Sequence, residues 1–425
     1  MIRTQLRVFS IAVLLLFLAL QVPHSIGAQR DLPTATAETV GMSASRLQRI
    51  HAFIQDYIDT DQIAGAVTLV ARRGKIVHFE AQGWRYKEEK LPMTKDTIFT
   101  FMSMTKPIVS TALMMLWEEG KFMLDDPISK WLPSYAQKEV LDPVSGRRTP
   151  ASRPVTIRQI LTHTSGLSLE PAVSGESGPK TLLEAIERSA PRPLAFQPGE
   201  KWQYGSSTDY VAVLVEKISG MSIDEFLRRR IFEPLGMEDT HYNIPKEKAG
   251  RIAAVYRPDK DGKITLLRKP EYHEPTTYFQ GVAGLKGTAA DYFRFAQMLL
   301  NGGEYGGQRL LGRMTVDLMI TNQIGSDKPV YVRGPGYGFG LGFGVLSDPS
   351  KSADALSIGS FTWGGADGTL FWVDPAEDLI GILMIQINPY SHFNIRPLFS
   401  VVVSQAIIDG LAAQKPRIMG YEISR

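Results

Sequence analysis

The stretch Phe99-Thr-Phe-Met-Ser-Met-Thr-Lys-Pro-Ile-Val109 places a serine, Ser103, and a lysine, Lys106, three positions apart in apolar sequence. Residues with this spacing lie on the same face of a helix, so the two side chains can meet. Burying a lysine is costly unless its amine is paired or neutral. A serine–lysine pair is one of the few arrangements that uses a buried amine for chemistry, which makes this stretch the first candidate for an active site.

The residues that follow predict a buried helix. They read IVSTALMMLWEEG and are apolar on nearly all sides until Glu118, with Gly120 as a terminator. Pro107 fits only near a helix start, so Ser103 is expected at or just before the first turn. There the serine N–H is an unpaired donor that can point at an oxyanion. A desolvated lysine amine favours its neutral form and can take the serine proton.

The same spacing also fits a purely structural role. Ser103 would then cap the helix, and Lys106 would extend its amine to solvent. The pattern is short enough to arise by chance, and it recurs at Ser177–Lys180 in a Gly/Pro-rich loop that cannot hold the two side chains together. Other motifs must decide between the two roles.

Composition narrows the function classes. A chain of 425 residues with 44% hydrophobic and 21% charged residues can bury a large core, as one big domain or two interleaved ones. The formal net charge of +3 is too small to indicate a nucleic-acid partner. The sequence contains no cysteine, which excludes thiol catalysis, zinc–thiolate sites and a lipid-modified N-terminal cysteine.

The first residues predict an export signal, residues 1–28. Arg3 and Arg7 give a positive start, Val8–Leu20 is an apolar run, Pro23 breaks it, and Ser25–Ala28 offers small residues for cleavage. The apolar run is short for a membrane span, so a cleaved signal is favoured over an uncleaved anchor, with no stable membrane span after cleavage. A periplasmic or secreted location is therefore expected.

Both ends of the mature chain predict a helix and paired strands. Ser43 can cap a helix whose apolar residues continue to Ile58, and Ala66–Ala71 with Lys75–Glu80 reads as a β-hairpin. Toward the other end, Gly368–Pro375 and Leu379–Gln386 are strand-like. An apolar helix with proline in its first turn follows at Pro397–Leu411.

The middle of the chain predicts helices. They are expected at Thr156–Leu161, Thr181–Ser189, Thr208–Ile218 and Ser222–Phe232, the last beginning with the capping box Ser222-Ile-Asp-Glu225. The expected fold class is α+β: an antiparallel sheet shared by both ends and flanked by the terminal helices, with an inserted helical part. The predicted division is a sheet domain of residues 29–100 and 276–425 and a mainly helical domain of residues 101–275.

Two further motifs are candidates for the site. Tyr204, in Tyr204-Gly-Ser206, precedes the helix expected at Thr208, and a tyrosine at such a junction can reach into a cleft or simply be half-buried. Trp363-Gly364-Gly365 precedes a strand, where paired glycines let a substrate backbone approach closely or form a plain turn.

Together these motifs resemble a known family. Ser103-Met-Thr-Lys106, Tyr204-Gly-Ser206 and Trp363-Gly-Gly365 look like the three motifs of serine β-lactamase-like hydrolases, the group of class C β-lactamases and D-alanyl-D-alanine carboxypeptidases, and especially its family VIII carboxylesterase branch. The likeness extends over roughly residues 40–410. Supporting phrases are Leu161-Thr-His-Thr-Ser-Gly-Leu167, Phe232-Glu-Pro-Leu-Gly-Met237, Ala283-Gly-Leu-Lys-Gly-Thr288 and Tyr337-Gly-Phe-Gly-Leu341.

The resemblance implies roles for the motif residues. Ser103 would be the nucleophile, and Lys106 and Tyr204 would handle its proton, without deciding which of the two is the resting base. The backbone N–H groups of Ser103 and Ala366 would form the oxyanion hole. Ser206 and the Trp363–Gly365 stretch would contact the substrate. The resemblance also implies a β-lactamase/transpeptidase-like fold with the site between the sheet and the helical part.

Two departures from the β-lactamases point toward esters. Their third motif begins with a lysine that holds the substrate carboxylate, whereas Trp363 carries no charge, and the esterase branch has Trp-Gly-Gly here. Their tyrosine motif usually ends in asparagine, and Ser206 is shorter. Esters with an apolar or aromatic acyl side are therefore the favoured substrates.

Other chemistries find no support in the sequence. No Gly-x-Ser-x-Gly elbow, metal-binding cluster or phosphate-binding loop is visible, and Asp259-Lys-Asp-Gly262 reads as a turn, so no metal or cofactor is expected. His163 is interpreted as a structural hydrogen-bonding residue rather than a catalytic base.

The sequence therefore predicts a serine hydrolase that cleaves carboxylic esters through an acyl-enzyme. The alternatives left open are a class C-like β-lactamase or a D-Ala-D-Ala carboxypeptidase (penicillin-binding protein), an acyltransferase, and a peptidoglycan-binding or sensory member without turnover. The expected partner is a small ester, β-lactam or peptide substrate, with the oligomeric state undetermined.

Overall fold

The computed structural model describes residues 31–167 and 178–410. The predicted export signal, residues 1–28, lies outside these ranges, as do Ser177 of the second Ser-x-x-Lys pattern and Leu411. Within the described ranges, no helix is both long enough and apolar enough to cross a lipid bilayer.

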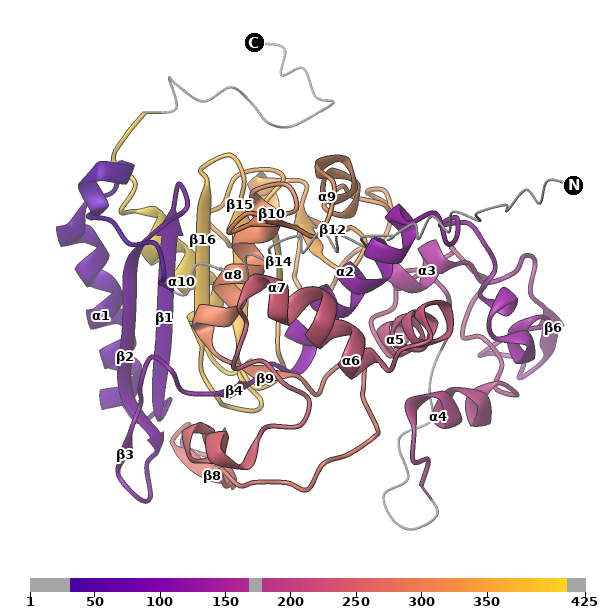
Figure 1. Ribbon diagram of the computed structural model, residues 1–425, viewed down its shortest axis with the longest axis horizontal. Coiled ribbons are helices and arrows are strands. Elements are labelled where there is room, and N and C mark those ends of the chain that lie inside the picture. The colour runs from indigo at the N-terminus through magenta and orange to yellow at the C-terminus, as the bar shows by residue number, and fades with distance from the viewer. Residues whose placement is uncertain (1–30, 168–177, 411–425) are drawn as a thin grey trace, which may run out of the picture.

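One eight-stranded antiparallel sheet forms the centre of the fold (Figure 1). Its order is β12-β13-β14-β15-β16-β1-β2-β3, so strands from the two ends of the chain meet where β16 pairs with β1. Every residue of β1, β15 and β16 is buried, which explains their nearly continuous apolar sequences. The strands are β1 (Gly65–Arg72), β2 (Lys75–Tyr86), β3 (Leu91–Pro92), β12 (Tyr337–Phe339), β13 (Gly344–Leu346), β14 (Phe361–Gly364), β15 (Leu370–Asp374) and β16 (Leu379–Met384).

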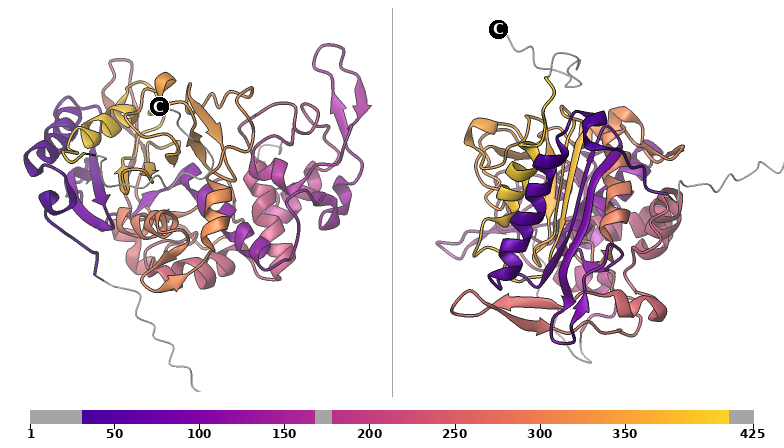
Figure 2. Two further views of the ribbon diagram at one scale, coloured as in Figure 1. Left: turned by 90° about the horizontal axis from the view of Figure 1, so that it is seen from above. Right: turned by 90° about the vertical axis from the view of Figure 1, so that its left-hand side faces the viewer.

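Helices cover both faces of this sheet (Figure 2). The terminal helices α1 (Ala44–Asp59) and α10 (Ile395–Ser404) pack together on one face. On the other face α8 (Ala289–Leu300) contacts β1, β15 and β16. The sheet is therefore the middle layer of a three-layer unit.

The helical part packs around α5, which contacts helices on several sides. Its helices are α2 (Thr105–Glu118), α3 (Ile157–Leu161), α4 (Leu182–Ser189), α5 (Ser207–Ser219), α6 (Ile223–Leu227) and α7 (Glu233–Leu235), with a π-helical turn at Arg228–Phe232. The remaining elements are α9 (Arg313–Met319) and four two-stranded ribbons: β4 (Phe99–Thr100) with β9 (Lys286–Gly287), β5 (Glu139–Leu141) with β6 (Arg148–Pro150), β7 (Val255–Pro258) with β8 (Ile264–Arg268), and β10 (Glu304–Tyr305) with β11 (Gln308–Arg309).

This architecture confirms the expected α+β, β-lactamase-like fold class. The described strands of the main sheet lie between residues 65 and 92 and between 337 and 384. The exact division into residues 29–100 with 276–425 and residues 101–275 stays a prediction. Sequence analysis did not identify α8 or the short strands β12 to β14.

Two local expectations were wrong. The C-terminal helix ends at Ser404 rather than Leu411, because the chain turns there so that Ala406 O accepts the Ser43 N–H and Ile407 pairs with Met42. The Ser222–Glu225 capping box is only half formed. Ser222 accepts the Glu225 N–H, but the Glu225 carboxylate pairs with Arg229 on the next turn.

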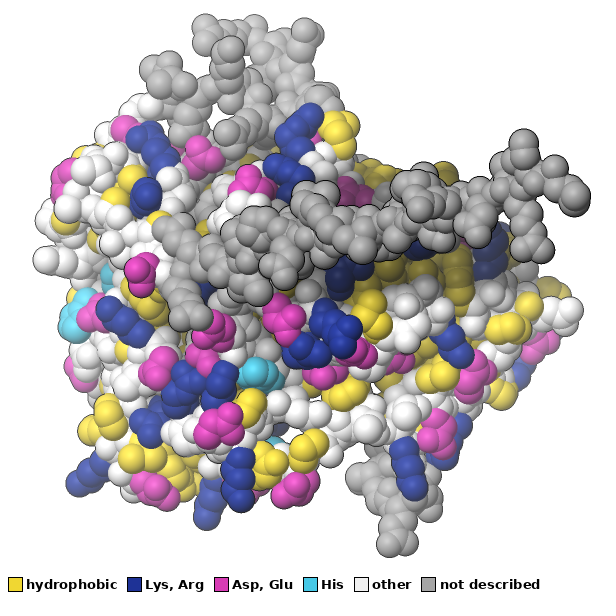
Figure 3. All heavy atoms as spheres, viewed as in Figure 1, with side chains coloured by type: hydrophobic (Ala, Val, Ile, Leu, Met, Phe, Trp, Pro, Cys, Tyr) yellow, Lys and Arg dark blue, Asp and Glu magenta, His cyan; other side chains and the backbone are white. Residues whose placement is uncertain are grey.

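The described surface carries both signs of charge. On the face drawn in Figure 3, Lys and Arg side chains are interspersed with Asp and Glu side chains. This mixture agrees with the small formal net charge of +3. It gives this face no continuous basic surface of the kind that binds nucleic acid.

A buried arginine ties the two ends of the chain to the sheet. Arg72, at the end of β1, is 1% exposed and bonds Glu377 Oε2 and Asp409 Oδ1, each at 2.6 Å. The same guanidinium donates to the carbonyls of Val40 and Gly41. Three segments far apart in sequence are thus held by one side chain.

We expect Arg72→Met to lower the free energy of unfolding by about 3 kcal/mol, because it leaves two carboxylates without their shared cation. Urea unfolding followed by circular dichroism measures the change. The control is Arg73→Met: Arg73 also pairs with Asp409 but is 42% exposed, so its loss should cost less than about 1 kcal/mol. Equal losses in the two variants would contradict this account.

Candidate active site

Ser103 lies on a short 3-10 turn, Met102–Met104, that runs directly into α2. The turn begins with Met102 at φ 49°, a left-handed conformation that non-glycine residues seldom adopt. Such local strain is found most often at functional sites. Ser103 remains partly exposed while the helix behind it is buried, so its hydroxyl can meet a substrate.

Lys106 is buried behind Ser103, with only 3% of its surface exposed. Its Nζ donates to Ser103 Oγ at 3.1 Å and to the carbonyl oxygen of Val282 at 2.9 Å. This burial excludes the alternative in which Lys106 extends to solvent. The predicted serine–lysine contact is present, with the amine held between two oxygens.

Tyr204 completes the group from the loop that precedes α5. Lys106 Nζ lies 4.7 Å from the centre of the Tyr204 ring. The Tyr204 hydroxyl accepts a hydrogen bond from Trp363 Nε1 at 3.2 Å, and its backbone N–H donates to the Tyr331 hydroxyl. The three sequence motifs therefore meet at one place, although they are separated by more than 250 residues of chain.

An aromatic cluster surrounds the Tyr204 ring. Trp202 lies nearly parallel to it with centroids 6.1 Å apart, and Trp363 is tilted against it at 5.2 Å. Tyr331 contacts Trp202 edge-on at 5.0 Å and is 58% exposed, so it forms the solvent-facing side of the cluster. Aromatic packing of this kind fixes the Tyr204 ring in place.

His163 is part of this packing. Its ring lies 5.1 Å from the Tyr204 ring and 5.3 Å from Phe339, and its Nδ1 has no hydrogen-bond partner among the described residues. Burial lowers the pKa of His163 to about 3, so the ring is neutral at physiological pH. His163 forms hydrogen bonds through its backbone: its N–H donates to the Ile160 carbonyl at 3.4 Å, and its carbonyl accepts the Gln203 N–H at 2.9 Å.

The glycine motif passes directly against the turn that carries Ser103. A Cβ on Gly365 would lie 2.3 Å from the Phe101 carbonyl oxygen, so only glycine fits. Thr369 Oγ1 donates to the same carbonyl at 3.2 Å. These contacts place Ala366, which is exposed, next to the Ser103 turn. This position of Ala366 is compatible with an oxyanion hole formed by the N–H groups of Ser103 and Ala366. That role stays a prediction.

The buried side chain of Arg396 forms hydrogen bonds with the backbone of this glycine turn. Its guanidinium donates to the carbonyls of Gly365, Gly368 and Thr369, the last at 2.7 Å, and its Cζ lies 3.4 Å from the centre of the Tyr390 ring. Burial lowers the pKa of Arg396 to about 10, which still leaves it charged at neutral pH. One buried cation therefore fixes the path of the turn that carries Ala366.

The other predicted contacts lie at the edges of this group. Gly364 is the last residue of β14, above the Arg396 guanidinium. Ser206 is the N-cap residue of α5, but its side chain does not cap the helix. Contact of Ser206, Trp363, Gly364 and Gly365 with a substrate stays a prediction, as does the expectation that no metal or cofactor is used.

Sequence analysis missed several residues that shape the site. Asp209 could have been suspected, because it follows Tyr204 by five residues and directly precedes the uncharged run Tyr210–Val215. Arg396 could have been suspected as a lone charge in the apolar C-terminal helix. Val282 contacts Lys106 through its backbone carbonyl, and Tyr331 comes from a distant loop. Neither residue could therefore be recognised as part of the site from the sequence.

Comparison with known proteins assigns the family. The family described as Beta-lactamase matches residues 50–399. Protein Rv1367c of Mycobacterium tuberculosis is 35% identical over 364 residues, which cover 80% of this chain and 89% of that protein. Esterase EstB of Burkholderia gladioli is 32% identical over 374 residues, which cover 80% of this chain and 91% of that protein. The chain therefore belongs to the Beta-lactamase family, and the resemblance drawn from its motifs is confirmed.

A solved structure agrees with this assignment. The structure of EstCE1, described as a hydrolase with promiscuous acyltransferase activity, matches with a TM-score of 0.72 and 25% identity, covering 86% of this chain and 99% of that one. Because the homologues are serine hydrolases such as esterases and carboxypeptidases, the protein is an enzyme of the serine hydrolase class.

We expect Arg396→Lys to lower kcat for a chromogenic ester by about 10- to 100-fold with little change in KM. A lysine cannot reach three carbonyls at once, so the glycine turn would shift, and loss of one oxyanion donor costs up to about 10³-fold in kcat. The control is Arg268→Lys, because Arg268 is half-exposed and pairs with Asp367 on the same turn. A kcat equal to that of the wild type in Arg396→Lys would contradict the conclusion that Arg396 fixes the path of the glycine turn.

The low pKa of His163 predicts how stability depends on pH. Below about pH 6.5 the unfolded chain binds a proton that the folded protein does not, so the free energy of unfolding should fall by about 1.4 kcal/mol per pH unit between about pH 6 and pH 4 because of this residue. His163→Asn, which tolerates the φ of 56°, should remove that part of the slope in urea titrations. Other histidines contribute equally to both proteins, so identical slopes would show that His163 is not the buried neutral group.

Proposed function

We propose that this enzyme hydrolyses carboxylic esters through an acyl-enzyme intermediate on Ser103. The observation that carries the proposal is the buried Lys106 amine, 3.1 Å from Ser103 Oγ and beneath the Tyr204 ring. A hydroxyl becomes a useful nucleophile when an adjacent group can take its proton, and this amine is positioned to do so.

Acylation would begin when Ser103 Oγ attacks the ester carbonyl carbon. The hydroxyl proton passes to Lys106, directly or with Tyr204, and the carbonyl oxygen gains negative charge. The backbone N–H groups of Ser103 and Ala366 would stabilise that oxyanion. The carbon–oxygen ester bond then breaks, and the same proton moves to the leaving alkoxide, which departs as an alcohol.

Deacylation would repeat these steps with water. A water molecule attacks the acyl carbon while the Lys106–Tyr204 pair takes its proton, and the proton returns to Ser103 Oγ as the carboxylic acid leaves. Lys106 and Tyr204 would transfer the proton in both acylation and deacylation. Neither of these two steps then needs a further residue that accepts or donates a proton.

The third motif supports esters over β-lactams. Trp363 is 3% exposed and donates its indole N–H to the Tyr204 hydroxyl, so this position offers no cation for a substrate carboxylate. The uncharged aromatic cluster around Tyr204, with Tyr331 exposed at its edge, favours an apolar or aromatic acyl side. The names of esterase EstB and of the lovastatin esterase of Penicillium rubens agree with this substrate class.

Transfer of the acyl group to an alcohol is a second candidate. The match to EstCE1, a hydrolase with promiscuous acyltransferase activity, supports it. An alcohol would take the place of water in deacylation, with the same residues moving the proton. A class C-like β-lactamase, a D-Ala-D-Ala carboxypeptidase and a peptidoglycan-binding or sensory member without turnover are distinguished by the substrates and adducts tested with Ser103→Ala.

We also propose that the protein is exported to the periplasm or medium. The support is the sequence of residues 1–28, with its basic start, apolar run and small residues before Gln29. N-terminal sequencing of the protein recovered from periplasmic and extracellular fractions tests this. A cytoplasmic protein that retains Met1 would contradict it.

We expect Ser103→Ala to reduce hydrolysis of p-nitrophenyl butyrate by at least about 10⁴-fold, because the nucleophile is lost. Lys106→Met should cost about 10² to 10⁴-fold through loss of proton transfer. Intact-mass spectrometry during turnover should find an acyl adduct on the wild-type protein and none on Ser103→Ala. The control is Ser177→Ala, the serine of the other Ser-x-x-Lys pattern, which should retain full activity.

Each other outcome has a defined meaning. Residual activity in Ser103→Ala near the wild-type level would refute the nucleophile. Faster turnover of nitrocefin than of the ester would favour a β-lactamase, and release of D-alanine from a D-Ala-D-Ala peptide would favour a carboxypeptidase. A stable acyl adduct without product release would favour a member that does not turn over, and formation of a new ester when an alcohol is added would favour the acyltransferase.

A further inference from the structure

A strap of backbone, Gln280–Leu285, lies directly behind Lys106. The second partner of the Lys106 amine is the carbonyl oxygen of Val282, at 2.9 Å. The position of this amine relative to Ser103 therefore depends on the position of one peptide group in the strap.

The strap is fixed to its surroundings at several points. The Tyr242 hydroxyl donates to the Gln280 carbonyl at 2.9 Å, and the Leu285 N–H donates to Thr105 Oγ1. A Cβ on Gly281 would lie 2.1 Å from the Thr208 carbonyl oxygen, so the strap packs directly against the first turn of α5. This close approach requires glycine at position 281.

The central anchor of the strap is Asp209. Its Oδ1 accepts the Val282 N–H at 3.0 Å, and the Gly281 N–H also stabilises its charged form. Val282 thus donates its N–H to a carboxylate while its carbonyl accepts from Lys106. A carboxylate on the N–H side of a peptide polarises it and strengthens the carbonyl as an acceptor.

Asp209 is an unusual residue to bury here. It is 3% exposed, it occupies the first turn of α5, and within the described ranges no lysine or arginine forms an ion pair with it. Burial raises the pKa of Asp209 to about 6, so it is ionised at neutral pH. A positive charge on Lys106 favours the ionised carboxylate. A buried carboxylate that has no ion pair is costly to retain unless it serves a purpose.

We propose that Asp209 is a positioning residue for Lys106, which it holds through the Val282 peptide. The proposal rests on the proposed function of Ser103 and Lys106. When Ser103 Oγ forms its bond to the carbonyl carbon, its proton moves to the Lys106 amine, which becomes an ammonium. The Asp209 charge offsets that new positive charge, and the Val282 carbonyl keeps the ammonium next to the leaving alkoxide that receives the proton.

Two substitutions of similar size separate hydrogen bonding from charge. Asp209→Leu removes the acceptor and the charge, and we expect kcat for p-nitrophenyl butyrate to fall at least about 100-fold with KM changed less than about threefold. Asp209→Asn keeps an oxygen acceptor for the Val282 N–H but loses the charge, and kcat should fall about tenfold. The rate of Ser103 labelling by a fluorophosphonate should fall in parallel with kcat.

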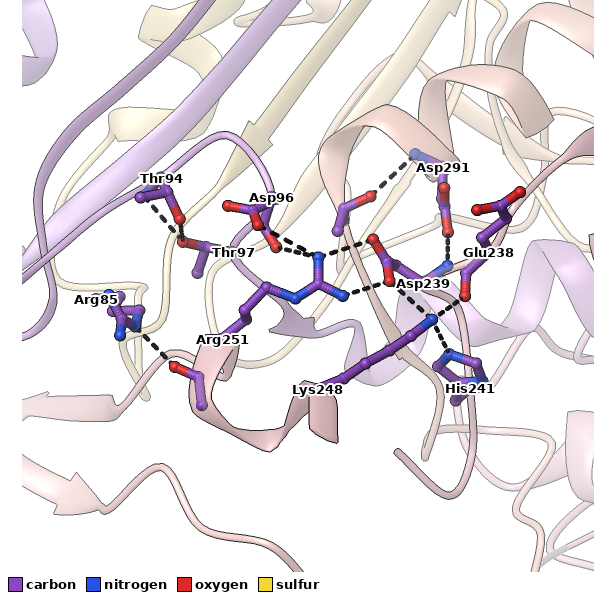
Figure 4. Close-up of polar contacts among 12 residues, drawn as sticks. Arg85, Thr94, Asp96, Thr97, Glu238, Asp239, His241, Lys248, Arg251 and Asp291 are labelled. Atoms are coloured by element: carbon purple, nitrogen blue, oxygen red, sulfur yellow. Dashed lines mark hydrogen bonds and ion pairs between the residues drawn. The ribbon is translucent and has the colours of Figure 1, made fainter. Parts of the chain in front are cut away.

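Asp291→Asn is the matched control. Asp291 is also buried on the first turn of a helix, α8, and accepts a backbone N–H, that of Asp239 (Figure 4). Its pKa is likewise raised by burial, to about 7, but no bond links it to Lys106 or Ser103. Asp291→Asn should lower the melting temperature as much as Asp209→Asn, while kcat and the labelling rate stay within about twofold of wild type.

The outcomes separate positioning from a structural role. A folded Asp209→Leu variant with kcat within threefold of wild type would overturn the proposal, and so would equal losses of kcat in Asp209→Asn and Asp291→Asn. If Asp209→Leu does not fold, the comparison of the two asparagine variants decides alone: an unchanged kcat in Asp209→Asn overturns the proposal. Ser103→Ala tests the proposed function separately, because it must abolish hydrolysis whatever the result at Asp209.

Discussion

The structure depends on placing one amine, that of Lys106, inside protein and beside Ser103. A buried amine is tolerated only where oxygens or aromatic faces replace water, and here Ser103 Oγ, the Val282 carbonyl and the Tyr204 ring do so. Each comes from a different segment: the turn before α2, the strap before β9, and the loop before α5. Because all three must converge, the packing of α2 against α5 and of the Met102–Met104 turn against β14 are conditions for the site to exist.

Two backbone segments outside the regular elements, the turn after β14 and Gln280–Leu285, contribute to the site. Gly365 and Gly281 each pass so close to a neighbouring carbonyl oxygen that a Cβ would overlap it. Two buried charged side chains then hold those backbone segments, Arg396 on three carbonyls of the glycine turn and Asp209 on N–H groups of the strap. Catalytic groups need positions fixed to within a fraction of an ångström. This protein obtains that precision by anchoring peptide groups rather than by adding reactive side chains.

The aromatic cluster gives the site its chemical character. Where the β-lactamases carry a lysine in the third motif, this chain has a buried tryptophan that bonds the Tyr204 hydroxyl. The substitution exchanges a group that attracts a substrate carboxylate for one that contacts the tyrosine and carries no charge. His163, which is neutral because it is buried, packs in the same aromatic cluster. Membership of the family therefore establishes the fold and the serine hydrolase class. The aromatic cluster is the feature that we use to propose the substrate.

Local patterns in the sequence were enough to predict the α+β class, the terminal hairpin and helices, and the Ser103–Lys106 contact, because turns, apolar periodicity and i,i+3 spacing act over a few residues. Similarity of the ordered motifs to a known family then predicted that Tyr204 and Trp363 would join them. Only the tertiary structure revealed the contacts of Asp209, Val282 and Arg396 around the site, and it also corrected the end of α10 to Ser404. The reason is physical: these residues act on peptide groups distant in sequence, and backbone carbonyls and N–H groups are the same in every residue, so the amino-acid sequence carries no mark of which ones will meet.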